Sequence, residues 1–133
     1  MSENNNDISI VMHPIGFISN SIYDPASARG KKDTVSLIVL KNEYSEGLDS
    51  ITDFEKIQVF FHFHLSEGFS MIQKRRYDGK TAGVFSSRSP NRPNGIGVTV
   101  VELLKVDGNI LHVKGLDAVN GTPVLDIKPY ILK

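Results

Sequence analysis

The chain has 133 residues, 40% of them hydrophobic, which predicts one domain with one packed core. Fifteen basic and fifteen acidic residues give a formal net charge of zero, so a nucleic acid could be bound only through a local basic patch. The absence of cysteine excludes disulfides, thiol catalysis and thiolate zinc sites and fits a cytoplasmic protein. No apolar run approaches the roughly 20 residues of a membrane span, so we expect no membrane partner.

The first half of the chain is predicted to form strands joined by loops. Residues 1–7 are polar and asparagine-rich, which predicts a flexible tail rather than a signal peptide and a folded domain at 8–133. Apolar alternation predicts strands at 8–18, 34–40 and 57–65, with a bulge at Gly16. In the second of these strands Val35, Leu37 and Val39 form the apolar face, and Thr34 and Ser36 lie on the other. Helical spacing of apolar residues predicts a short helix at 48–56, and the loop at 19–32 carries a small basic patch.

The predicted strand at 57–65 places two histidines on one face, because His62 and His64 are two residues apart. The pair is either part of a binding face or two polar side chains on a solvated face. A metal site would need a third ligand, and no acidic cluster lies nearby in the sequence. We therefore expect no metal.

The second half continues the β pattern. Residues 66–82 are predicted to be a long loop whose basic run, Lys74-Arg75-Arg76, is either solvated surface or a phosphate contact. Strands are predicted at 96–106 and 110–114 around an Asp107-Gly108-Asn109 turn, and at 124–132 with a break at Pro129. Many short strands with at most one or two short helices predict an all-β barrel or sandwich with long loops.

The stretch from Gly83 to Gly97 has the most unusual composition, because two prolines stiffen a loop that carries Arg88 and Arg92. A stiff loop with paired arginines suits the binding of carboxylate or phosphate, since each guanidinium offers a planar fork of donors. The alternative is a surface turn with two solvated arginines. We expect this loop and the 120–123 turn to share one rim of the barrel.

Two long motifs in this half are similar to those of a known family. The segment 83–97 resembles the family pattern GVFATRSPxRPNPIG, and the segment 116–130 resembles LDxxDGTPVxDIKPY. Pro14-Ile15-Gly16 and His64 match as well, so that the resemblance covers nearly the whole chain. The chain thus resembles the TsaA-like, or TrmO, family.

The resemblance implies a small dimeric β-barrel that binds S-adenosylmethionine and methylates N6 of threonylcarbamoyladenosine beside the anticodon of tRNA. It implies a cofactor-binding set made of His64, Leu65, Arg88 and the turn Asn120, Gly121, Thr122 and Pro123. We expect Asp126, Lys128 and Arg92 to carry the chemistry and Asn94 and Tyr130 to contact the substrate. Asp126 either accepts the N6 proton or acts as a structural partner of Lys128.

Three features depart from the family pattern. Gly95 replaces a proline, which is expected to loosen the loop, and Ala28-Arg29-Gly30 replaces a segment that contributes to cofactor contact. Longer members of the family carry a further C-terminal domain, so the sequence does not predict which tRNA is the substrate. The competing functions are a non-enzymatic barrel that binds the cofactor or RNA, and a methyltransferase acting on another small substrate.

Overall fold

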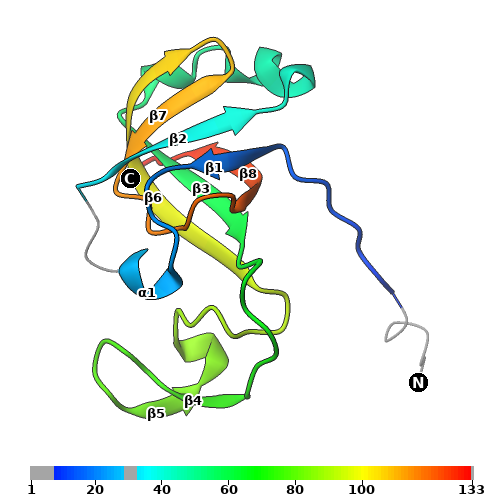
Figure 1. Cartoon of the computed structure of the whole chain (residues 1–133), viewed down its shortest axis with the longest axis vertical. Helices are drawn as coiled ribbons and strands as arrows, with labels where there is room; N and C mark the ends of the chain where they lie inside the picture. The colour runs from blue at the N-terminus through cyan, green and yellow to red at the C-terminus, as the bar shows by residue number, and fades with distance from the viewer. Residues whose placement is uncertain (1–7, 29–32, 133) are drawn as a thin grey trace.

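The computed structural model describes residues 8–28 and 33–132, so the predicted tail at 1–7 and the basic residues at 29–32 lie outside the described residues. The fold is a closed antiparallel barrel with the strand order β1-β2-β7-β6-β3-β8, which confirms the predicted mostly-β barrel (Figure 1). Its strands are β1 (Gly16–Ser19), β2 (Val35–Leu40), β3 (Lys56–His62), β6 (Ile96–Asp107), β7 (Ile110–Lys114) and β8 (Pro123–Pro129). Helix in this described part is limited to α1 (Pro25–Ala28) and three 3-10 turns, Asn42–Leu48, Ile51–Asp53 and Val84–Ser86.

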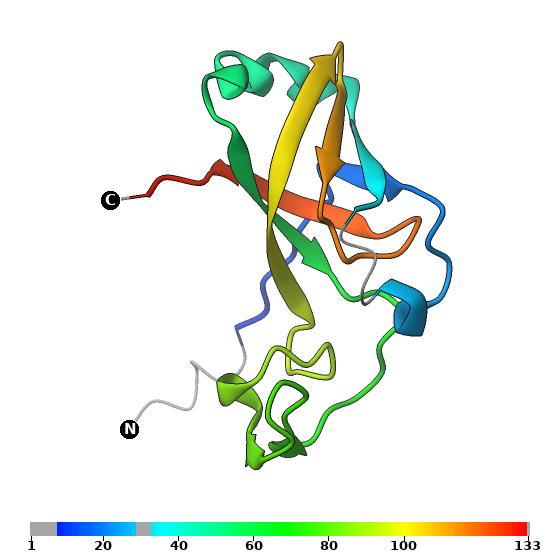
Figure 2. The ribbon, with the colours of Figure 1, turned by 90° about the vertical axis from the view of Figure 1, so that its left-hand side faces the viewer.

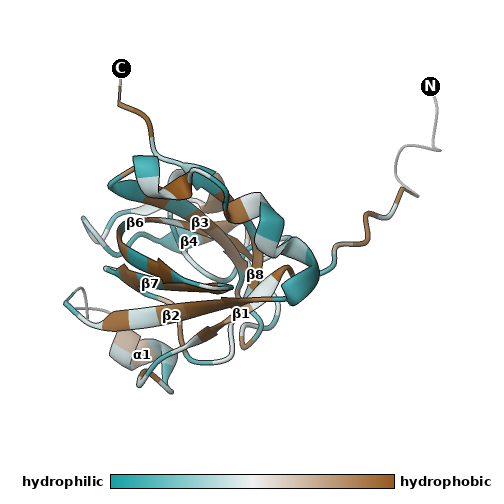
Figure 3. Ribbon diagram, turned by 90° about the horizontal axis from the view of Figure 1, so that it is seen from above, coloured by the Kyte–Doolittle hydropathy of each residue, from teal (hydrophilic) through white to brown (hydrophobic). Residues whose placement is uncertain are grey.

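The barrel interior is filled mainly by branched aliphatic side chains. In the view from above, the strands that surround it are coloured largely as hydrophobic (Figure 3). Residues with no measurable exposure include Ile38, Ile57, Val59, Leu111, Val113 and Val124. Within β2 the buried face is Ser36, Ile38 and Leu40, whereas the alternation in the sequence favoured Val35, Leu37 and Val39. Ser36 is accommodated inside because its hydroxyl accepts a hydrogen bond of 2.9 Å from the Asn20 amide.

Two predicted elements of the first half, the first strand and the short helix, were wrong in extent or type. The first strand begins only at Gly16, which pairs with Leu40 in a continuous register and forms no bulge. Its glycine is needed because an added Cβ would meet the backbone of β2, including Leu40 Cα at 2.9 Å. The helix predicted at 48–56 is replaced by two 3-10 turns, since Ser50 between them adopts a φ of 68°.

Residues 63–95 leave the barrel between β3 and β6 and form a separate lobe at one end of the molecule, which we call the loop lobe (Figures 1 and 2). The predicted strand at 57–65 therefore ends at His62. The lobe contains a hairpin, β4 (Ile72–Lys74) and β5 (Thr81–Gly83), where the sequence predicted only a loop. A hydrogen bond of 2.7 Å from Phe63 N–H to the Gly95 carbonyl closes its neck. No helix in the described part is long and apolar enough to cross a membrane.

Candidate functional site

The loop lobe and the 120–123 turn lie at the same end of the barrel, as the sequence predicted. Strand β3 ends and β6 begins at this rim, where Phe61 pairs with Gly97 on one side. On the other side Phe61 pairs with Val124, one residue after the turn. Both motifs therefore border the same three strands, although about 25 residues separate them in the sequence.

A bulge in β8 turns two predicted site residues, Asp126 and Lys128, to the outside of the barrel. Val124 and Asp126 would share a face in a regular strand, because side chains alternate. The register shifts between Phe60 and Phe61, so that Phe61 faces Val124 while Phe60 faces Asp126. Val124 is fully buried and Asp126 is exposed, which makes Leu125 the extra residue. Such bulges are common beside active sites, where they re-aim a side chain.

Two of the predicted site residues, Asp126 and Lys128, lie beside Phe60 on the outer face of β3 and β8, and Arg88 contacts the backbone of the neighbouring strand β6. The Lys128 ammonium lies 5.6 Å from the centre of the Phe60 ring. Arg88 reaches across from the loop lobe and donates a hydrogen bond of 2.6 Å to the carbonyl of Val98, the β6 partner of Phe60. Asp126 is the β8 partner of the same residue. A carboxylate and an aromatic ring thus share one row of the sheet, and the Lys128 ammonium lies near the ring from the next row of this face.

Asp126 is not tied to Lys128 by an ion pair. The ion pair found within residues 8–28 and 33–132 is Arg75–Asp78. Asp126 Oδ1 instead accepts a hydrogen bond of 2.8 Å from the N–H of Ile127. Asp126 is exposed on the outer face of the sheet, where its carboxylate is accessible as a proton acceptor.

A pocket of about 320 Å³ lies under the neck of the loop lobe. Its walls include His62, Phe63, Phe69, Arg92 and Asn94. Arg92 Nη1 donates hydrogen bonds of 3.0 Å to the carbonyls of Ser87 and Ser89, so this arginine also fixes the loop. Its position allows one guanidinium to hold the loop and to face a bound anion.

The backbone conformation at position 95 favours glycine and excludes the proline of the family pattern. Its φ of 61° is unavailable to proline, and an added Cβ would lie 3.3 Å from His62 Nε2. The backbone here therefore differs from what the proline of the family pattern would adopt. Two hydrogen bonds hold the loop in this conformation. Arg92 donates one to the Ser87 carbonyl, and the Gly95 carbonyl accepts the other from Phe63 N–H.

The side chains of the 120–123 turn serve mainly to build the turn itself. The Thr122 hydroxyl is buried and donates a hydrogen bond of 2.7 Å to the Val119 carbonyl. The Asn120 side-chain oxygen accepts from Asn20 N–H at 3.0 Å. Gly121 is exposed with a φ of 85°, a backbone conformation that favours glycine. A ligand at this turn would contact Gly121 and Pro123 rather than the Thr122 hydroxyl.

The remaining predicted residues are spread more widely. His64 and Leu65 are exposed just beyond the end of β3. Tyr130 follows the far end of β8, where its N–H donates to the Lys56 carbonyl at 3.0 Å, so that it lies away from Asn94 and the rim. The structure adds Phe60 and His62, which share the outward face of β3 with Gln58. These residues occupy alternate positions of the strand, and this spacing in the sequence indicated that they share one face.

Within the described residues no group of three or more histidine, aspartate or glutamate side chains is placed to hold a metal ion. The groups available on the outer face and in the pocket are therefore arginine, lysine, carboxylate, imidazole and aromatic rings. These groups can bind a zwitterion with an aromatic base and can accept a proton.

Comparison with known proteins gives consistent matches. The sequence matches the family of tRNA-methyltransferase O N-terminal domains over residues 19–133. An S-adenosyl-L-methionine-binding protein of Archaeoglobus fulgidus is 36% identical over 91% of this chain and 89% of that protein. The tRNA (adenine(37)-N6)-methyltransferase of Homo sapiens is 43% identical over 68% of this chain, but the match spans only 21% of the human protein. A crystal structure of TrmO from Pseudomonas aeruginosa has a TM-score of 0.77 at 28% identity, over 93% of this chain and 57% of that one.

Proposed function

Because the chain belongs to the family of tRNA-methyltransferase O N-terminal domains, we propose that it is an S-adenosylmethionine-dependent methyltransferase acting on tRNA in the cytoplasm. Its substrate atom in this proposal is N6 of threonylcarbamoyladenosine beside the anticodon. The observation that carries the proposal is the placement of Asp126 and Lys128 beside Phe60 on one outer face, with Arg88 bound to the neighbouring β6 backbone. The similar human protein is named for methylation of the same nitrogen of adenine 37.

The residues on this face and Arg88 beside it fit S-adenosylmethionine. Arg88 supplies a cation for its amino-acid carboxylate, and Phe60 with the neighbouring valines supplies an apolar surface for its adenine. The bound cofactor would supply an electrophilic methyl group. The exposed backbone of the turn at Gly121 extends the same rim.

The chain's own residues would position the substrate and remove its proton. The threonyl carboxylate of the modified base requires a cation, and Arg92 in the pocket or Lys128 on β8 can provide it. N6 is a urea-like nitrogen and a poor nucleophile, so holding it in line gives most of the gain, about 7–11 kcal/mol for well-aligned reactants. The exposed oxygen of Asp126 is suited to accept the N6 proton.

Replacing Arg88 by alanine is expected to weaken S-adenosylmethionine binding by about tenfold or more, since a charge-assisted hydrogen bond contributes roughly 1.5–3 kcal/mol. Titration calorimetry measures the dissociation constant. Arg88→Lys tests whether the planar fork matters, and Lys105→Ala is a control that removes an exposed cation on the barrel. Binding by the alanine variant at the affinity of the unmodified protein would remove Arg88 from the site.

The tRNA substrate is tested in cells and in vitro. Mass spectrometry of tRNA nucleosides from a strain lacking the gene should show threonylcarbamoyladenosine without its N6-methyl group. Purified protein should restore the methyl group on that tRNA. Cofactor binding without methylation would instead support the non-enzymatic barrel, an alternative favoured by the binding-protein name of the similar-length archaeal protein.

We also propose that the protein acts as a homodimer in which the partner covers the outer face of β6, β3 and β8. Apolar side chains are exposed there, with Ile96 at 38% and Val100 at 40%. The site on this face is open in one chain, and a second copy would exclude water from it.

Light scattering should give twice the mass of one chain, and Val100→Asp should give a monomer with weakened cofactor binding. Val35→Asp is a matched control, because Val35 is similarly exposed at 47% on β2, outside these three strands. A monomer at micromolar concentration that binds the cofactor with full affinity would show that the partner is not part of the site.

A further inference from the structure

The loop lobe concentrates positive charge in a chain that is neutral overall. Residues 66–95 contain six basic side chains, Lys74, Arg75, Arg76, Lys80, Arg88 and Arg92, against two acidic ones, Glu67 and Asp78, which gives a net charge of +4. Since the whole chain has 15 of each sign, the remainder carries a net charge of −4. Such an asymmetry directs an anionic macromolecule to the lobe and away from the rest of the protein.

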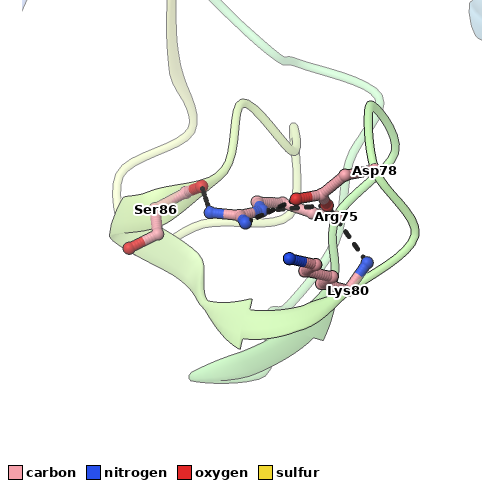
Figure 4. Close-up of polar contacts among 4 residues, drawn as sticks. All are labelled: Arg75, Asp78, Lys80 and Ser86. Carbon is pink, nitrogen blue, oxygen red and sulfur yellow. Dashed lines mark hydrogen bonds and ion pairs between the residues drawn. The ribbon is translucent and has the colours of Figure 1, made fainter.

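The turn between β4 and β5 is held by one arginine, as Figure 4 shows. Arg75 forms an ion pair of 2.6 Å with Asp78 and donates to the Ser86 carbonyl at 3.2 Å. The Lys80 N–H donates to the same carboxylate at 3.1 Å. The Arg75 guanidinium holds the pKa of Asp78 below its ordinary value, so the carboxylate is ionised and neutralised by Arg75 at neutral pH. Lys74, Arg76 and Lys80 are exposed and take part in no ion pair within residues 8–28 and 33–132.

Two aromatic rings project from the same lobe. Tyr77 is 78% exposed and Phe85 is 73% exposed, so neither ring contributes to a core. Arg75 links them, because its guanidinium lies 4.8 Å from the Tyr77 ring centre and contacts Ser86, the neighbour of Phe85. Exposed rings that are held in place among cations are the combination with which proteins bind single-stranded nucleic acid.

We propose that Lys74, Arg76, Tyr77, Lys80 and Phe85 form an RNA-binding surface, which we call the hairpin surface. The inference rests on the proposed function. It assigns RNA binding to the hairpin surface and the methyl transfer to the outer face of β6, β3 and β8. The three cations contact phosphates, and the two rings stack on unpaired bases. RNA fits better than a protein partner because the surface combines net positive charge with two separate rings that are largely exposed.

The test is fluorescence anisotropy of a labelled anticodon stem–loop RNA, titrated at several salt concentrations. The triple variant Lys74→Gln, Arg76→Gln, Lys80→Gln should lower the slope of log affinity against log salt by about 2, at about 0.7 for each lost phosphate contact. Tyr77→Ala should weaken binding roughly tenfold while Tyr77→Phe retains it, because stacking needs the ring and not the hydroxyl. A matched triple variant removes the same charge from exposed barrel lysines, Lys41, Lys56 and Lys105, and should leave RNA affinity nearly unchanged.

Calorimetry with S-adenosylmethionine on the same variants separates this inference from the proposed function. Lost RNA affinity with normal cofactor binding supports the hairpin surface. Wild-type RNA affinity in the hairpin variants would overturn it, even where the unmodified protein methylates tRNA. An altered mass in light scattering with unchanged RNA affinity would also overturn it and identify the surface as a protein interface. Absence of RNA binding by the unmodified protein overturns both the hairpin surface and the tRNA substrate.

Discussion

Asp126→Asn is expected to slow methyl transfer by roughly 10²–10⁴-fold, the usual contribution of a positioned general base. Asparagine preserves the shape of the side chain and its acceptor for the Ile127 N–H, so β8 keeps its local geometry. The substitution removes only the ability to take up a proton. Single-turnover assays with saturating tRNA measure the loss, and calorimetry should show nearly unchanged cofactor affinity.

The alternative role of Asp126 gives a different pattern. A structural carboxylate would leave the rate intact in the asparagine variant and would lower the melting temperature in Asp126→Ala. A full rate in the asparagine variant would exclude Asp126 as the base.

Local pattern predicted the parts of the fold that depend on neighbouring residues. The turn at Asp107-Gly108-Asn109 and the strand Ile110–Lys114 follow from turn chemistry and alternation, and Gly108 has the required positive φ of 62°. Pro129 ends β8 because it cannot donate to the sheet. These features need no information about distant strands.

The composition of the site depended on pairings that the sequence pattern does not contain. The bulge at Leu125 depends on how β8 pairs with β3, and it decides that Asp126 faces outward. The choice of buried face in β2 was missed for a related reason. Valine and leucine occupy its outward positions, and a serine is placed inside by a hydrogen bond from Asn20. Alternation alone identifies two faces without telling which of them meets the core.

Phe61→Ala is expected to lower the free energy of unfolding by about 3–5 kcal/mol, the usual cost of removing a buried phenyl ring. Phe61 is 2% exposed and packs edge-on against Phe63, with ring centroids 5.2 Å apart. It also lies in the row between Gly97 and Val124, beneath the rim that carries the loop lobe and the turn. Urea denaturation measures the change, and Phe61→Leu should cost much less because it retains most of the apolar volume.

Gly97 supplies a second variant that tests the same packing. A Cβ on Gly97 would lie 2.7 Å from ring atoms of both Phe61 and Phe63, so Gly97→Ala should cost about 1–3 kcal/mol in the otherwise unmodified protein. Removing the Phe61 ring opens space for the added methyl group. The double variant should therefore be less destabilised than the sum of the two single variants, because the residues share one contact. Gly47→Ala is the control, since its Cβ would meet no atom within 4 Å. Strict additivity of Phe61→Ala and Gly97→Ala would contradict the close contact between this ring and the β6 backbone.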